Sequence, residues 1–158
     1  MGVRMIDQPS TTSYLSEHKT TAELMSEFSK KATKFLYPKP HVLFNWGEPA
    51  KSVYLVRSGE VVLTMPISGK QAMSLHAGEN SLVGLPATFS NEPYSMTATA
   101  QRNTEVERMD REQFRLMLVM KPALSLHILR ILAEETRSAR IGIVEAGAKR
   151  RHVLKRKA

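Results

Sequence analysis

Residues 83–100, VGLPATFSNEPYSMTATA, have the outline of a loop that holds a small anion. Gly84 ends a β-like run, about ten loop-prone residues follow, and the alternation typical of a strand resumes at Ser95. The segment nevertheless contains no Arg or Lys that could pair with an anion. Its residue types leave three interpretations open: a working ligand site, a site for an uncharged molecule, or a turn without a ligand.

The other residues with reactive or metal-binding side chains do not gather into a recognisable site. The five histidines, at positions 18, 41, 76, 127 and 152, never form a close pair with metal-ligand spacing. His41 and His76 could meet across a barrel, but a surface or hydrogen-bonded role is commoner for a lone histidine. Glu48 and Glu60 each follow a glycine and are interpreted as turn carboxylates. With no cysteine and no nucleophile or phosphate-binding motif, the chain is predicted to be no enzyme and to hold no metal or cofactor.

The positive charge is concentrated at one end of the chain. Residues 149–158, KRRHVLKRKA, contain six Lys or Arg and no acid, which leaves only +2 of the formal net charge of +8 for residues 1–148. Such a run is typical of a solvated tail, and it could also make weak, non-specific contact with a polyanion. No apolar run approaches the roughly 18 residues that span a bilayer, so the chain is predicted to be cytoplasmic and not to bind membranes.

The segments that must position residues 83–100 begin with a polar lead and a helix. Residues 1–20 are rich in Ser, Thr and charge and lack a hydrophobic period, which predicts a flexible lead. Apolar residues then recur at three- and four-residue steps from Ala22 to Phe35, with Thr21 as a candidate N-cap. This pattern predicts a helix of about four turns that ends at Tyr37-Pro38, because proline cannot continue a helix.

The chain after Pro40 has the pattern of short β-strands for about seventy residues. Turn signals such as Ser58-Gly59 and Ala77-Gly78 separate segments rich in β-branched or aromatic residues. The predicted strands are His41–Phe44, Ser52–Val56, Val61–Met65, Gln71–His76, Leu82–Val83, Ser95–Ala100 and Glu105–Met109. Many short strands at roughly ten-residue spacing indicate a sandwich, jelly roll or barrel.

The helical period returns at Asp110, a candidate N-cap for a short helix that stops before Pro122. Pro122 suits the first turn of a longer helix, whose apolar positions run from Leu124 to Ile143. Within it, a stripe over residues 129–146 has the spacing of a two-helix seam. The stripe therefore predicts either a homodimer through this helix or docking of the helix on the β domain.

Glycines and their neighbours at the strand ends follow a definite pattern. The elements G-E-x-A, a Tyr-containing strand and S-G-x-V are formed by Gly47, Glu48, Ala50, Tyr54, Ser58, Gly59 and Val61, and Gly78 and Gly84 bracket the next strand. Over about residues 35–146, this pattern and the order of elements resemble the cyclic nucleotide-binding domain family. The resemblance implies a mainly β fold, a jelly roll (double-stranded β-helix) with an N-terminal helix and a C-terminal helix pair. Such a domain would span residues 21–148, between the lead 1–20 and the basic tail 149–158.

The resemblance places the family's phosphate-binding cassette on residues 84–100. That cassette normally supplies a Glu for the ribose and an Arg for the cyclic phosphate, whereas Leu85 and Tyr94 occupy the matching positions here. Pro86 also removes one backbone N–H. The missing contact with Arg would cost about 1.5–3 kcal/mol, or roughly ten- to a hundredfold in affinity. The ligand-contact residues implied by the resemblance are Gly84, Leu85, Pro86, Ala87, Tyr94, Ser95, Met96 and, at an adenine-contacting position of the long helix, Arg140.

The resemblance implies a regulatory module that senses a small-molecule or nucleotide-like ligand, does not bind cyclic AMP in the usual way, and signals through its C-terminal helix. The cassette would then only close the barrel, bind cyclic nucleotide weakly through backbone donors, or hold a less anionic or larger ligand. In that last case the neutral hydrogen-bonding residues would be Tyr94, Ser95, Ser90 and Asn91. The alternatives are a dimerising, protein-interaction or structural subunit and a nucleic-acid accessory protein that uses the basic tail. About ten residues follow Ala148, too few for the helix-turn-helix domain of the family's transcription regulators.

Overall fold

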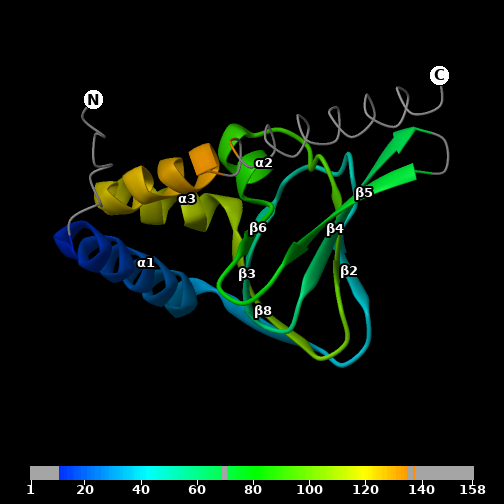
Figure 1. The fold of residues 1–158 in the computed structure, drawn as a ribbon, viewed down its shortest axis with the longest axis horizontal. Helices are drawn as coiled ribbons and strands as arrows, with labels where there is room; N and C mark the ends of the chain where they lie inside the picture. The colour runs from blue at the N-terminus through cyan, green and yellow to red at the C-terminus, as the bar shows by residue number, and fades with distance from the viewer. Residues whose placement is uncertain (1–10, 69–70, 135–136, 138–158) are drawn as a thin grey trace, which may run out of the picture. The chain divides into compact units, whose positions relative to one another are not determined.

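The computed structural model of this protein describes residues 11–68, 71–134 and 137 (Figure 1). The chain divides into two compact units, residues 1–121 and 122–158, which are described separately. The first unit contains α1 (Thr11–Lys31), a set of β-strands, α2 (Leu85–Ser90) and α3 (Arg111–Met120). The second unit begins with a helix at Pro122–Glu134.

The strands of the first unit form two antiparallel sheets of four strands each, with the orders β1-β8-β3-β6 and β2-β7-β4-β5. Their bounds are β1 (Thr33–Tyr37), β2 (His41–Phe44), β3 (Ser52–Ser58), β4 (Val61–Ser68), β5 (Gln71–Ala77), β6 (Leu82–Val83), β7 (Thr97–Ala100) and β8 (Thr104–Asp110). Most hydrogen-bonded neighbours are distant in sequence, so the chain passes repeatedly from one sheet to the other. This is the jelly-roll arrangement predicted from the sequence.

The core lies between the two sheets and is formed by side chains that alternate inward along the strands. Its aromatic centre consists of Phe44, Tyr54 and Tyr94, and the small residues Ala98 and Ala100 face it from β7. β3 is buried over its first five residues, because its outer face also meets α2 and α3. This strand therefore joins the core to the helices that cover it.

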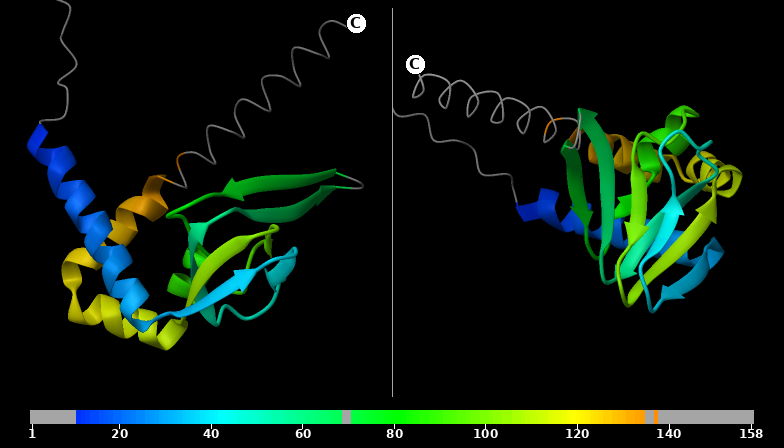
Figure 2. Two further views of the ribbon diagram at one scale, coloured as in Figure 1. Left: turned by 90° about the horizontal axis from the view of Figure 1, so that it is seen from below. Right: turned by 90° about the vertical axis from the view of Figure 1, so that its right-hand side faces the viewer.

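α1 and α3 pack together against the outer face of the β1-β8-β3-β6 sheet (Figure 2). Phe28 of α1 is fully buried, and its ring meets that of Phe114 edge-on with 6.3 Å between the ring centroids. Glu27 lies 2.6 Å from Nζ of Lys30 and 3.2 Å from Nζ of Lys121. These two lysines lower the pKa of the Glu27 carboxyl, so the pairing adds a charged contact beside the aromatic one.

The N-terminal helix differs from the sequence prediction at both ends. It begins at Thr11, so residues 11–20 of the predicted flexible lead are helical, and it ends at Lys31 rather than near Tyr37. Phe35 has helical spacing in the sequence but lies in β1, where its partner is Val106 of β8. The backbone pairing of β1 with β8 outweighs the local helical period, which is a case of tertiary context overriding propensity.

The later elements match the predictions apart from one additional helix and the ends of some elements. The segment predicted as a ten-residue loop contains α2, and the strand expected from Ser95 begins at Thr97. α3 occurs where a short helix was predicted and ends before Pro122. Asp110 occupies its N-cap position, but the Asp110 side chain makes no capping hydrogen bond. The other six predicted strands all occur in the sheets.

The second unit is described only at its beginning. Its helix starts at Pro122, as the sequence predicts. Among the described helices, none is by itself long and apolar enough to cross a membrane, although α3 and the helix Pro122–Glu134 pass this test of length and composition when they are counted as one bent pair. Arg140, the stripe residues beyond Leu132 and the basic tail 149–158 lie outside the described residues.

Replacing Phe28 with Ala should separate α1 from α3. We expect the free energy of unfolding to fall by about 3–5 kcal/mol, because a fully buried ring is removed and a cavity remains. Urea denaturation followed by circular dichroism measures the change. Leu116→Ala on the exposed face of α3 is the matched control and should cost less than about 0.5 kcal/mol. Equal losses in the two variants would contradict this packing.

Candidate functional site

The cassette segment begins at a glycine with a backbone conformation that other residues rarely adopt. Gly84 follows β6 and is the N-cap of α2, with φ of 81° in the left-handed region. A Cβ at this position would lie 3.0 Å from Cε1 of Tyr94 and 3.3 Å from the carbonyl oxygen of Ser52. Gly84 therefore turns the chain into α2 and also allows the ring of Tyr94 to approach the backbone.

Hydrogen bonds from the hydroxyl of Thr88 and the guanidinium group of Arg111 hold α2 against the neighbouring elements of the first unit. The buried Oγ1 of Thr88 lies 2.8 Å from the carbonyl oxygen of Gly84 and 3.2 Å from that of Ser52, so its proton is shared between these two acceptors. Arg111, the first residue of α3, donates from Nε to the carbonyl oxygen of Thr88 at 3.1 Å and from Nη1 to Oδ1 of Asn91. The arginine thus satisfies the carbonyl end of α2 and links it directly to α3.

Tyr94 occupies the position at which the resemblance places the phosphate-binding arginine. Its ring stacks on that of Phe44 with 3.7 Å between the centroids, and only 4% of the residue is exposed. Its hydroxyl donates to the carbonyl oxygen of Ser52 at 2.6 Å and accepts from the N–H of Ser52 at 3.1 Å. The phenol therefore both donates and accepts within the protein itself.

The phenols of the core stay protonated at neutral pH. Burial raises the pKa of Tyr94 above its ordinary value, and burial raises that of Tyr54 to about 12. Neutral phenols carry no charge that could pair with a phosphate. The arginine position thus contributes an uncharged, buried side chain.

The other predicted contact residues are divided between the core and the surface. Leu85 and Ala87 are buried, Met96 is half-buried, and Pro86 and Ser95 are exposed. Ser90 donates to the carbonyl oxygen of Pro86 at 2.9 Å, and Oδ1 of Asn91 accepts from Arg111. Arg140 lies outside the described residues. Two of the proposed neutral hydrogen-bonding residues, Ser90 and Asn91, are therefore already engaged inside the chain.

Comparison with known proteins identifies the family. A family model described as cyclic nucleotide-binding domain matches residues 34–120, from β1 to the end of α3. The chain belongs to the cyclic nucleotide-binding domain family.

The relatives of this cyclic nucleotide-binding domain include regulators of transcription. The CRP-like cAMP-activated global transcriptional regulator of Mycobacterium tuberculosis is 28% identical over 102 residues, which are 64% of this chain and 46% of that protein. The chain thus spans about half the length of the curated relatives it matches. The Catabolite Activator Protein of Thermus thermophilus aligns with a TM-score of 0.67 and 25% identity, covering 78% of this chain and 57% of its own. The sensor domain of the transcriptional regulator DNR from Pseudomonas aeruginosa has a TM-score of 0.58 at 23% identity, over 70% of this chain and 79% of its own.

A cavity beside the cassette of this cyclic nucleotide-binding domain does not open onto the predicted contact residues. Its volume is about 510 Å³, and its lining is Pro49, Ala50, Lys51, Asn91, Glu92, Pro93, Asp110, Arg111 and Glu112. Residues 84–87 and 94–96 are absent from this lining. The lining contains three carboxylates and two cations, a balance that disfavours a phosphate.

The histidines and turn carboxylates of the domain have separate structural partners. Nδ1 of His76 lies 2.9 Å from Oε1 of Glu60, and the ring of His41 stacks on Tyr37 with 4.5 Å between the centroids. Glu48 accepts hydrogen bonds from the backbone and the side chain of Asn45, which holds its turn. Within the described ranges, no group of three or more His, Asp or Glu residues could hold a metal ion.

Sequence analysis did not single out Ser52, Thr88 or Arg111 as parts of this site. Ser52 contributes main-chain atoms only, so its residue type carries no signal for these contacts. Thr88 and Arg111 are 23 residues apart and meet only because α2 and α3 are neighbours in the fold. The one signal present in the sequence was an aromatic residue at the arginine position.

Removing the hydroxyl of Tyr94 should destabilise the domain. In Tyr94→Phe the buried N–H of Ser52 loses its acceptor, and we expect the free energy of unfolding to fall by about 1–3 kcal/mol. Chemical denaturation measures the change. Tyr37→Phe is the control, since the Tyr37 hydroxyl makes no hydrogen bond within the described part of the chain, and it should cost less than about 0.5 kcal/mol. A neutral Tyr94→Phe substitution would show that the phenol does not hold the cassette.

Proposed function

We propose that this domain is a regulatory module whose cassette is closed by its own side chains and does not take cyclic AMP in the usual way. The observation that carries the proposal is the position of Tyr94, packed on Phe44 and bonded to Ser52. A cyclic phosphate would have to displace this ring to reach the backbone donors of α2. It would then meet neither a guanidinium at position 94 nor a carboxylate at Leu85.

The energetic terms support a closed cassette. A cyclic phosphodiester keeps one negative charge, and the missing arginine contact weakens its binding by about 1.5–3 kcal/mol. Displacing Tyr94 would also leave the buried N–H of Ser52 unpaired, which adds about 1–3 kcal/mol. Together these costs correspond to roughly a hundred- to ten-thousandfold loss of affinity.

The output of the module, in this proposal, is the position of its C-terminal helices. Arg111 gives the cassette a direct connection to α3, because it bonds to Thr88 and to Asn91. A ligand or partner that moved α2 would act on α3 through these bonds, and α3 leads within two residues into the helix that begins at Pro122. Such coupling requires that the ligand bind one arrangement more tightly than the other. The regulatory names of the relatives support this role.

Isothermal titration with cyclic AMP and cyclic GMP at millimolar ligand tests the closed cassette. We expect dissociation constants of about a millimolar or weaker, because both charged anchors are missing. Titration with 5′-AMP is the control, since it carries the same base and a phosphate but no cyclic ester. A low-micromolar dissociation constant for either cyclic nucleotide, absent for 5′-AMP, would contradict the proposal.

Self-association through the C-terminal helix is the alternative function that the exposed surface favours. Leu126 and Leu129 of the helix Pro122–Glu134 are 65% and 49% exposed. Their spacing of three residues places them on one face of the helix. Two exposed leucines on one face give this helix an apolar surface that a second copy could cover.

Light scattering tests this alternative. We expect a particle of twice the chain mass of 17.8 kDa, and we expect Leu126→Glu combined with Leu129→Glu to reduce it to a single chain. Leu116→Glu, at an exposed position of α3, is the matched control and should leave the dimer intact. A monomer for the unchanged protein, or a dimer that survives the double substitution, would rule this interface out.

A further inference from the structure

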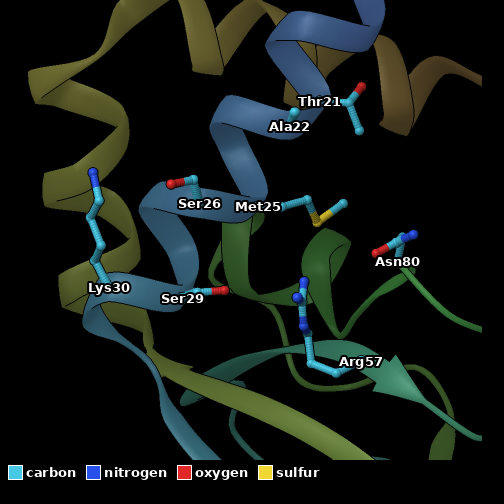
Figure 3. Close-up of a pocket in the computed structure, with 8 residues that line it drawn as sticks. All are labelled: Thr21, Ala22, Met25, Ser26, Ser29, Lys30, Arg57 and Asn80. Carbon is cyan, nitrogen blue, oxygen red and sulfur yellow. The ribbon is translucent and has the colours of Figure 1, made fainter.

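A second cavity of the first unit lies between α1 and the end of β3, away from the cassette. Its volume is about 730 Å³, within the range of roughly 300–1,000 Å³ that is usual for small-molecule sites. Six residues of α1, one of β3 and one of the turn before β6 line it: Thr21, Ala22, Met25, Ser26, Ser29, Lys30, Arg57 and Asn80 (Figure 3). We call it the α1 cavity.

Arg57 places in the α1 cavity a guanidinium group whose Nη groups make no hydrogen bond within the described residues. Its side chain points from β3 into the space beneath α1 (Figure 3), and 37% of it is exposed. Among the described residues, its side chain pairs only with Oε1 of Glu107, which lies 3.8 Å from Nε and is too distant for a hydrogen bond. Within the described residues, no acceptor is hydrogen-bonded to its two Nη groups. A guanidinium in this state presents a fork of N–H donors that matches a carboxylate.

Asn80 adds a second hydrogen-bond donor to the α1 cavity, its side-chain amide. Its backbone lies in the left-handed region with φ of 66°, and its N–H donates to the carbonyl oxygen of Val56 at 2.8 Å. These features fix the residue at the rim of the α1 cavity (Figure 3). Its side-chain amide makes no hydrogen bond to any described residue, so its N–H groups are available to an acceptor.

Among the described residues beside Arg57, two cations lie near one carboxylate. Glu107 is 1% exposed, and its Oε2 accepts from Ser29 at 2.5 Å. Its Oε1 accepts no hydrogen bond in the described structure and has two cations near it, Arg57 at 3.8 Å and Nζ of Lys34 at 3.6 Å. Two cations thus lie near one carboxylate. A singly charged anion beside Arg57 would compensate the second positive charge.

The lysine in the lining does not change this balance. Lys30 pairs with Glu27 at 2.6 Å, and the same carboxylate also pairs with Lys121 at 3.2 Å. Lys121 in turn lies 3.5 Å from Glu23, so two lysines meet two carboxylates in this second group. Of the two cations in the lining, Arg57 is therefore the one that shares a single carboxylate, Glu107, with a second cation, Lys34.

We propose that the α1 cavity binds a small monocarboxylate with an apolar body. The carboxylate accepts two N–H bonds from the Nη groups of Arg57 and one from the amide of Asn80. The apolar body lies against Met25 and Ala22, which are the apolar members of the lining. The ligand would thereby bridge α1, β3 and the turn before β6. Its binding would stabilise the packing of α1 against α3. This inference does not depend on whether the cassette is closed.

The test is a titration of the full chain with benzoate, followed by the backbone amide signals in two-dimensional NMR. We expect saturable shifts at Ser26, Ser29 and Asn80, and no such shifts with benzyl alcohol, which has the ring but no charge. Arg57→Gln should weaken benzoate binding about tenfold or more. Arg102→Gln, an exposed arginine in the turn after β7, is the matched control and should leave binding unchanged. Equal binding by the Arg57→Gln and Arg102→Gln variants would overturn the proposal.

A second pair of variants keeps the test decisive if Arg57→Gln fails to fold. Asn80→Asp places a carboxylate in the lining and should weaken benzoate binding about tenfold or more through like-charge repulsion. Asn103→Asp makes the same change at another left-handed turn residue, outside the lining, and should have little effect. Undiminished binding by Asn80→Asp, or shifts that follow the exposed lysines without saturating, would also overturn the proposal.

Discussion

The two hydrogen bonds between the hydroxyl of Tyr94 and the main chain of Ser52 hold the cassette against the barrel. They join the residues that precede β7 to the first residue of β3, while the ring stacks on Phe44 and both rings lie close to Gly84. The hydroxyl of Thr88 donates to the same Ser52 carbonyl oxygen, so Ser52 also holds α2 in place. In the proposed closed cassette, a nucleotide would have to compete with this aromatic ring of the protein itself.

β3 connects the cassette to the charged region under α1. Its first residue, Ser52, accepts a hydrogen bond from Tyr94, and its middle is buried between the core and the helices. Arg57, near its end, pairs with Glu107. A buried carboxylate is stabilised only when charges and donors surround it, and Ser29, Lys34 and Arg57 meet this need from three different elements. The strand is therefore the physical link between the two regions in which a ligand could act on the helices.

Residue patterns were sufficient to predict the fold, because much of its signal is local, whereas the loss of the nucleotide anchors stays a prediction. Glycines at turns, alternating strands and Pro122 at a helix start are set by backbone geometry, and Tyr94 at the arginine position is visible in a single line of sequence. The predicted end of α1 was wrong, because the pairing of Phe35 with Val106 is a long-range contact that local periodicity does not reveal. The bonds from Thr88 and Arg111, and the α1 cavity, were also beyond sequence reasoning, because segments far apart in the chain form them.

The stacking of Tyr94 on Phe44 has a consequence for how such a domain can change over generations. A single exchange of Tyr94 for arginine would put a charge against a phenyl ring and strip Ser52 of its partner, so stability would fall before any affinity for phosphate returned. Position 85 would then still lack its carboxylate. A nucleotide-binding form of this cassette would thus need several replacements at once, because both Tyr94 and Leu85 would have to change.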